Sequence, residues 1–445
     1  MNGGDLNANS IVVAALFVHQ ISRTWEGGLS GLRHNYAPVF AVHMAGWATA
    51  ASQILALPLA LTAALWGGTM WMRGASVVLV VLWMLSVQRR LANHAWLGIV
   101  STIGFAFTPA HTDPLIARDL LVGVYLSAAL FKLNGEYLFS SRSAGRVVLA
   151  FYFGQLGLRP ARFQLRWLPA GVILSEFAVG ALLLIPHGVL PALVIAMVMH
   201  TAFGVSGNFP FSITALALWA LVMSPRAGYL VLPMAHDVVW WAVPLFAVLA
   251  LTLGRTSPGA RPPGLLAKDT CLGVVYGVLC ASALGRPEPT FPGGSSTVMV
   301  NCVIGAMFLL NVGLVMAGVK LEWSFAMFSS LRPFGRSWIQ RGARREWPRY
   351  YHLTLPDRIP KALLKSVPAG FLYQSTKGTH VVHEAVARRL EDLAGKHGLT
   401  FQPKQVESNR ESNALVPKLT QSEPRRTILL FPAIISKEFS QSHLG

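Results

Sequence analysis

The chain has 445 residues, of which 53% are hydrophobic and only 13% are charged. Soluble domains carry about 25% charged residues, so the composition argues against an ordinary soluble protein. The net charge of +18 comes without a basic run interleaved with stacking aromatics, which argues against nucleic-acid binding. We therefore expect an all-α polytopic membrane protein with a small soluble C-terminal region of α+β type.

Cysteine usage and the amino terminus narrow the class further. Cys271, Cys280 and Cys302 form no CxxC pair and lie in apolar surroundings. They are typical of small buried or lipid-facing residues rather than of a thiol-redox centre. The first ten residues are polar and lack a basic n-region, so no cleaved signal peptide is expected. No metal site is predicted.

Hydrophobic segments follow one another along residues 1–335, which we predict to form one multi-helix membrane domain. The first, at 11–20, is too short to span a bilayer and predicts an interfacial or amphipathic helix. We expect nine to eleven segments in total, because short ones such as 272–284 are also compatible with a re-entrant path. The others are expected at about 38–66, 75–87, 94–107, 116–139, 169–185, 190–205, 211–223, 229–253, 272–284 and 298–318.

Basic residues gather outside these segments. The stretches 88–90 and 142–166 carry several arginines, which by the positive-inside rule predicts cytoplasmic connections and cytoplasmic termini, with a surface helix near 147–157. Residues 320–445 hold 20 Lys and Arg against 10 Asp and Glu. We expect the basic loops and the C-terminal region to contact anionic lipid headgroups. The predicted location is the cell membrane.

Residues 336–445 are predicted to be a basic soluble region, which we call the tail. Thr379 is a plausible N-cap for a helix over 382–393, because apolar residues recur there at helical spacing. Strands are expected at 399–401 and 427–431, separated by a flexible polar segment near 407–424.

Three titratable side chains lie in apolar runs: Lys132, Glu176 and His200. A charged amine at the centre of a lipid-buried helix costs about 2.5–3.5 kcal/mol on insertion scales, so it either snorkels to the interface or has a use. Burial favours the neutral amine, which is a competent general base. Simpler interpretations stay open: a snorkelling or phosphate-binding lysine, a structural partner carboxylate and a hydrogen-bonded packing histidine. Spacing alone does not show that the three meet.

The order of these pieces resembles a known family. The segment 125–134 (YLSAALFKLN) is similar to the lysine segment of vitamin K-dependent gamma-carboxylases, which share the HTTM (horizontally transferred transmembrane) domain with many bacterial proteins. Segments 175–186 and 200–216 resemble the glutamate helix and the His-then-Phe-Ser segment of that domain. The loop at 111–121 and the segment at 321–333 fit its remaining pieces. The resemblance covers about residues 10–335.

The resemblance implies that Lys132 deprotonates a quinol-like lipid, reduced vitamin K or menaquinol, with His200 and Glu176 placing or tuning it. In the family the quinol then reacts with oxygen to give a strong base that removes a substrate proton, and carbon dioxide captures the carbanion. Asn134 and Asn208 are the expected contacts to this cofactor, and a peptide or protein is the implied substrate. The tail does not correspond to the large lumenal region of the carboxylases, so the quinol chemistry is better supported than carboxylation of protein glutamates.

Two other classes of function remain open. The first is a non-catalytic membrane scaffold or lipid-binding partner subunit that works through its basic tail. The second is a haem protein with two axial histidines chosen from His43, His94, His111 and His200, although no pair of these has a spacing that favours it.

Overall fold

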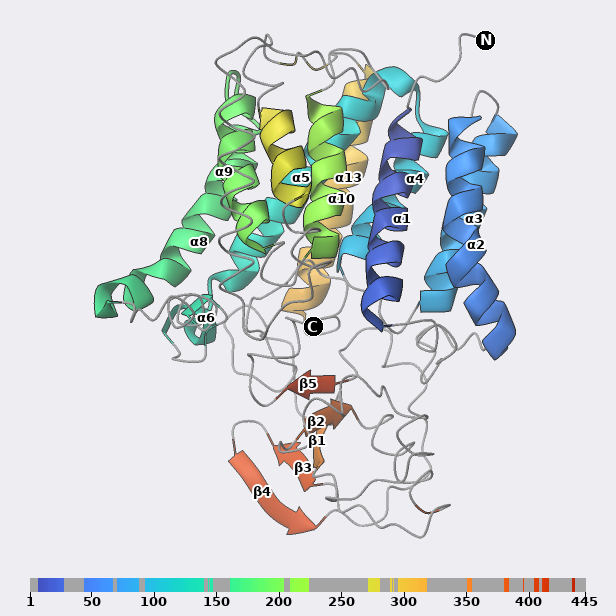
Figure 1. The fold of residues 1–445 in the computed structure, drawn as a ribbon. Helices are drawn as coiled ribbons and strands as arrows, with labels where there is room; N and C mark the ends of the chain where they lie inside the picture. Colours follow the sequence, from blue (N-terminus) through green and yellow to red (C-terminus); the bar gives the residue numbers. More distant parts are fainter. Residues whose placement is uncertain are drawn as a thin grey trace.

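The computed structural model describes the helical part of the chain in several stretches and the tail in short ones. The described residues are 7–27, 44–66, 70–87, 93–139, 143, 145–146, 161–203, 209–223, 271–280, 289, 291, 295–317, 350–353, 380–383, 395, 404–407, 410–415 and 434–436. Within them the helices precede the strands along the chain (Figure 1).

The described helices are mostly apolar. They are α1 (Ala8–Gly27), α2 (Gly46–Leu65), α3 (Met70–Val87), α4 (Asn93–Phe107), the 3-10 turn η3 (Ala110–Thr112), α5 (Asp113–Lys132), α6 (Gly135–Phe139), α8 (Arg162–Leu182), α9 (Val189–Phe203), α10 (Phe209–Val222), an apolar helix at Cys271–Cys280 and α13 (Ser295–Met316).

Five of the described helices are long and apolar enough to cross a membrane: α2, α3, α5 together with η3, α8 and α13. A bilayer core about 30 Å thick needs about 20 apolar residues in a helix, and each of these has 18 or more. The predicted class, a mostly helical membrane protein, is confirmed at this level. The count of nine to eleven segments stays a prediction, since the segment at 229–253 lies outside the described residues.

Helix α1, whose apolar part was predicted to be an interfacial or amphipathic helix, packs within the bundle. It packs against α2, α4 and α10 and buries Val12, Val13 and Leu16 completely. These side chains recur at helical spacing and are enclosed by the neighbouring helices, so α1 is part of the bundle. Its interfacial or amphipathic character stays a prediction, because packing against other helices does not fix where α1 lies relative to a bilayer.

Helix α8 begins earlier than predicted. Its expected start at 169 followed from the arginines before it, which we assigned to a cytoplasmic connection. In the structure Pro169 lies inside the helix, and Arg162 and Arg166 belong to its first turns. The start is fixed by Gln164, whose Oε1 accepts a hydrogen bond from the Ala161 backbone N–H at 2.8 Å. Such a contact satisfies one of the N–H groups at a helix start that lack a helical partner.

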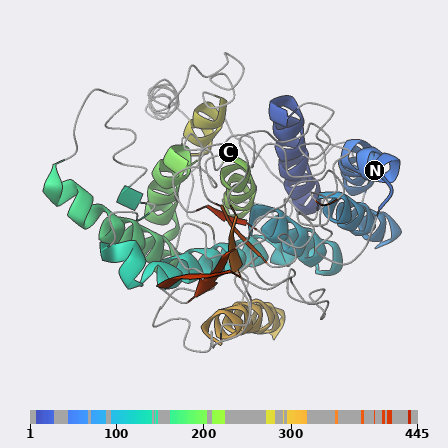
Figure 2. The same cartoon turned by 90° about the horizontal axis from the view of Figure 1, so that it is seen from below.

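Helix α5 is central to the bundle. It packs against α4, α8, α10 and α13, and most of its side chains are buried. Seen from below, α13 lies at the edge of the bundle beside α5 (Figure 2). The contact is close, because a Cβ placed on Gly123 would collide with the Phe308 ring. Gly180 of α8 similarly leaves room for Leu126 of α5, so glycines set how near both neighbours approach α5.

The tail contains a five-stranded sheet, drawn below the helices in Figure 1. Its strands are β1 (Tyr350–Leu353), β2 (His380–His383), β3 (Lys404–Glu407), β4 (Arg410–Leu415) and β5 (Ile434–Ser436), in the order β4-β3-β1-β2-β5. All four pairings are antiparallel, with Tyr350 opposite His383 and His380 opposite Ser436.

These strands correct two predictions for the tail. Residues 382 and 383, expected to begin a helix, belong to β2, because pairing with β1 and β5 overrides the weak helical spacing. The segment 407–424, expected to be flexible, contains β4, which pairs with β3. The predicted strands at 399–401 and 427–431, the rest of the predicted helix, the surface helix at 147–157 and the domain boundary at 335 lie outside the described residues.

Candidate functional site

Lys132 is the last residue of α5, where the chain turns out of the helix at Leu133. A cation is favoured at this position, because the carbonyl groups of a helix end carry partial negative charge. Its side chain is only 3% exposed, so it does not snorkel to the surface. The amine is held inside the protein.

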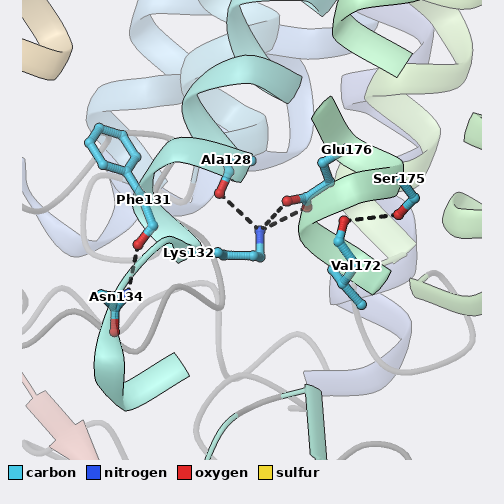
Figure 3. A network of polar contacts seen from close by, with 7 residues as sticks. All are labelled: Ala128, Phe131, Lys132, Asn134, Val172, Ser175 and Glu176. Atoms are coloured by element: carbon cyan, nitrogen blue, oxygen red, sulfur yellow. Dashed lines mark hydrogen bonds and ion pairs between the residues drawn. The ribbon is translucent and has the colours of Figure 1, made fainter. Parts of the chain in front are cut away.

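Glu176, on α8, is the partner of this amine. Lys132 Nζ donates to both carboxylate oxygens of Glu176, at 2.7 Å and 2.9 Å, and approaches the Ala128 carbonyl oxygen at 3.5 Å (Figure 3). The Glu176 side chain is 5% exposed. Lys132 and Glu176 therefore form a buried ion pair between two membrane-length helices, and we call them the Lys132–Glu176 pair.

The close packing of α5 and α8 makes this contact possible. A Cβ on Gly180 would lie 2.7 Å from Leu126 Cδ2, so the glycine lets the two helices approach one turn away from Glu176. On the other side, Tyr137 of α6 packs with Ala129 and Ile173, each of which lies one helical turn from a member of the pair. Burial, together with the nearby Glu176 charge, raises the pKa of Tyr137 above its ordinary value, so its phenol stays neutral.

Asn134 has a structural role in the turn from α5 to α6. Its Nδ2 donates to the Phe131 carbonyl at 2.8 Å, and its Oδ1 accepts from the Tyr137 backbone N–H at 2.9 Å. The side chain thus caps α6 and also satisfies a carbonyl at the end of α5. Its expected contact with a quinol stays a prediction. Asn208, the other expected contact, lies outside the described residues.

His200 has a different set of contacts from the one we expected. This fully buried side chain on α9 shares a hydrogen bond of 2.5 Å between its Nε2 and the Tyr125 hydroxyl. The Trp219 indole N–H donates to the same hydroxyl at 3.1 Å. Tyr125 lies seven residues before Lys132 on α5, which is about 10 Å along the helix axis. The structure therefore brings Lys132 and Glu176 together and places His200 with Tyr125.

The backbone of His200 is also held in place. Ser212 Oγ donates to the His200 carbonyl oxygen at 2.9 Å, and the Tyr276 hydroxyl donates to the Ser212 carbonyl oxygen at 2.7 Å. Because α9 ends at Phe203, the His200 carbonyl is one of the four that a helix end leaves without a helical partner. These contacts join α9, α10 and the helix at 271–280. Sequence analysis did not single out Tyr125, Ser212, Trp219 or Tyr276.

The structure also bears on the haem hypothesis. His111 lies in η3, exposed, at the start of α5, whereas His200 contacts Tyr125, fourteen residues further along. That separation is about 20 Å along the helix, so these two side chains do not bind one iron. The hypothesis is untested for His43, which lies outside the described residues, and for His94, whose side chain is not described. No group of three His, Cys, Asp or Glu within the described stretches has the arrangement to hold a metal ion.

Comparison with known proteins, by family models, by curated sequences and by solved structures, returned no match. The resemblance to the HTTM family therefore stays a prediction. The function is argued below from the buried pair itself.

Proposed function

We propose that this protein is a multi-pass enzyme of the cell membrane, built on an HTTM-like domain, in which Lys132 acts as a base toward a quinol-like lipid. The observation that carries the proposal is the Lys132–Glu176 pair, because ionisable groups inside membrane helices are costly and are characteristic of functional sites. The family resemblance of the surrounding segments supplies the reaction class.

The pair suits this chemistry because each partner can hold the proton that the other releases. An ammonium cannot act as a base until it gives up a proton, and the Glu176 carboxylate lies within hydrogen-bond distance of that proton. Moving the proton from Nζ to Oε1 converts the ion pair into a neutral amine and a carboxylic acid without separating charge. Lys132 is then free to take a proton from an acidic hydroxyl.

The residues around the pair fit a lipid-soluble hydroquinone. Apolar helices surround an amine and a carboxylate, and the Tyr137 ring packs with Ala129 and Ile173 one helical turn from the pair, an apolar and aromatic setting that suits a ring carrying an ionisable hydroxyl. Reduced vitamin K or menaquinol would supply that hydroxyl and the reducing power when bound. Lys132 would take the hydroxyl proton, and Glu176 would orient the amine. We propose a peptide or protein as the carbon-acid substrate and anionic lipid headgroups as contacts of the basic loops and tail.

The test supplies purified protein in detergent with reduced vitamin K or menaquinol, oxygen and bicarbonate, and follows the quinone epoxide by mass spectrometry. We expect epoxide from the wild type and a loss of about 10²–10⁴-fold in Lys132→Ala, the range for removing a general base. Ser175→Ala is the matched control, because its hydroxyl donates to the Val172 carbonyl and does not touch the pair (Figure 3). Equal epoxide from the wild type and Lys132→Ala would disprove the role of the lysine.

A second function, a non-catalytic scaffold or lipid-binding subunit, is favoured by the same geometry in one respect. A carboxylate that contacts the amine through both oxygens joins α5 to α8, as a purely structural pair would. This alternative predicts that removing residues 336–445 abolishes the cellular phenotype and binding to anionic vesicles. It also predicts that Lys132→Met with Glu176→Met leaves both unchanged.

A further inference from the structure

The first turns of α8 extend past the end of α5. Gly180 of α8 lies against Leu126 and Glu176 contacts Lys132, so positions fall along α8 as they rise along α5, and the two helices are antiparallel. Because Lys132 ends α5, residues 162–175 of α8 lie beyond that end, which is about 20 Å of helix. The start of α8 lies at the edge of the bundle in both views (Figure 1, Figure 2).

Two stripes of exposed side chains run along this segment. Arg162 and Arg166 are four residues apart, which places them on one face of the helix, and Phe163 and Trp167 share the adjacent face in the same way. The two aromatic residues are 65% and 63% exposed, and the Arg166 guanidinium carbon lies 5.6 Å from the centre of the Trp167 ring. A basic stripe beside an apolar stripe is typical of a helix at a membrane–water interface.

The positive charge of this segment is not balanced by nearby acidic residues. Residues 140–175 contain several arginines and no Asp or Glu, and the next acidic residue, Glu176, is already paired with Lys132. Neither Arg162 nor Arg166 has a carboxylate partner among the residues that the structure describes. The backbone N–H groups at the start of a helix add partial positive charge, and such ends bind phosphate groups. The start of α8 is therefore suited to an anion from outside the chain.

The length of α8 sets the level of these stripes in a bilayer. From Trp167 to the exposed His187, in the turn after α8, there are about 20 residues, which is about 30 Å of helix. This is the thickness of the hydrocarbon core, and tryptophan is enriched at its boundary with water. With Trp167 at one boundary and His187 at the other, Arg162 and Arg166 lie at the level of the lipid phosphates.

We propose that the start of α8 binds the phosphate group of an anionic phospholipid. The guanidinium groups of Arg162 and Arg166 donate to the phosphate oxygens, for which the planar fork of arginine is suited. Phe163 and Trp167 pack against the acyl chains beside the headgroup. We call residues 162–167 the α8 lipid site. It differs from a general attraction of basic loops to anionic membranes, because it is a defined helical segment that holds one headgroup.

The α8 lipid site also fixes the depth of the Lys132–Glu176 pair. Glu176 follows Arg166 by ten residues, which is about 15 Å along the helix, or half of the hydrocarbon thickness. The bound lipid holds α8 at this level, so the pair lies inside the hydrocarbon layer. In the proposed function, on which this step rests, Lys132 is therefore reached by a hydroquinone dissolved in the lipid and not by one dissolved in water.

Lipid binding is measured on the full chain by native mass spectrometry, after release from phosphatidylcholine bilayers that contain phosphatidylglycerol. The wild type should retain phosphatidylglycerol in preference to phosphatidylcholine. Arg162→Gln with Arg166→Gln should weaken this binding about 30-fold, because each arginine near an anionic surface contributes about 5-fold.

A matched control separates the site from loop charge. Arg142→Gln with Arg159→Gln removes the same charge from the preceding connection and should keep the preference for phosphatidylglycerol. Equal losses in the two double variants would overturn the site, since the charge of the connection would then be sufficient. Displacement of the lipid by soluble glycerol phosphate would also overturn it, because the proposed site requires the acyl chains.

The depth of α8 has its own readout. Phe163 and the 67% exposed Leu174 lie on the same exposed stripe, eleven residues apart. Nitroxide labels on Phe163→Cys and Leu174→Cys, with Cys271 and Cys302 replaced by Ala, report depth through their relaxation by oxygen and by a water-soluble nickel complex. Leu174 should lie about 12–16 Å deeper than Phe163, the range for a helix tilted by up to 40°. Equal depths would overturn the proposal. Both measurements are independent of catalysis, so a wild type that forms no epoxide refutes the proposed function alone.

Discussion

The Lys132–Glu176 pair makes a quantitative prediction about stability. Both side chains are at most 5% exposed, so solvent does not screen their contacts of 2.7 Å and 2.9 Å. Removing one partner of such a pair costs about 3–5 kcal/mol of unfolding free energy, because the other charge is left buried alone. Lys132→Met should therefore be strongly destabilising. Glu176→Gln should lose less, about 1–3 kcal/mol, because the amide still accepts one hydrogen bond from the amine.

The double variant separates pairing from packing. Lys132→Met with Glu176→Met replaces both charges by flexible apolar side chains of similar size, and such replacements are neutral to about 4 kcal/mol stabilising. Equilibrium unfolding in mixed micelles titrated with SDS, for the wild type, each single Met variant and the double, gives the coupling energy. We expect more than about 2 kcal/mol, well above the 0.2–1 kcal/mol of an exposed pair. Coupling below about 1 kcal/mol would refute the claim that these charges depend on each other in the folded protein.

Two further predictions concern α5 and α13. Gly123→Ala should lower the free energy of unfolding by about 1–3 kcal/mol, because the added methyl overlaps the rigid Phe308 ring. Gly171→Ala is the control: no atom lies near its Cβ, so the change should be neutral or stabilising by up to about 1 kcal/mol. Thermal unfolding measures both, and equal effects would disprove the close α5–α13 contact. Cys302 is exposed within α13, whereas Cys280 is buried. In intact membranes an apolar maleimide should therefore label Cys302 and a charged maleimide should not. Cys280 should react only after the protein is denatured. Labelling of Cys302 by the charged reagent would argue against a lipid-facing α13.

The Lys132–Glu176 pair was accessible from sequence for a physical reason. Lys132 ends the apolar run of α5, and Glu176 interrupts the apolar run of α8. A charge inside protein or lipid needs an opposite partner, and these two were the oppositely charged candidates in neighbouring apolar segments. Sequence could name the candidates without showing their contact, because the approach of α5 to α8 depends on Gly180 facing Leu126. A hydropathy profile does not show which glycine lets two helices approach each other, so the contact could not be predicted from it.

The bounds of helix α8 and of strand β2 could not be predicted from the hydropathy pattern. The start of α8 depends on one side-chain contact, from Gln164 to the Ala161 N–H, and Pro169 interrupts the helix without ending it. In the tail, the strand β2 is four residues long and is defined by its pairing with β1 and β5, which are distant in the chain. Local spacing therefore favoured a helix there, while the non-local pairing decides the structure.

The hydrogen-bond partner of His200 was harder to predict from sequence, because it lies on another helix, α5. His200 was grouped with Lys132 because both are titratable residues in apolar runs, although its actual partner is Tyr125. One signal was present: Tyr125 and Lys132 lie seven residues apart, so a helix places them on nearly the same face. A tyrosine there must satisfy its hydroxyl inside the bundle, and an imidazole from another apolar helix can accept it. The face that presents Lys132 to α8 thus presents Tyr125 to α9 and α10 two turns earlier, which is why one helix carries both the buried ion pair and the hydroxyl that binds His200.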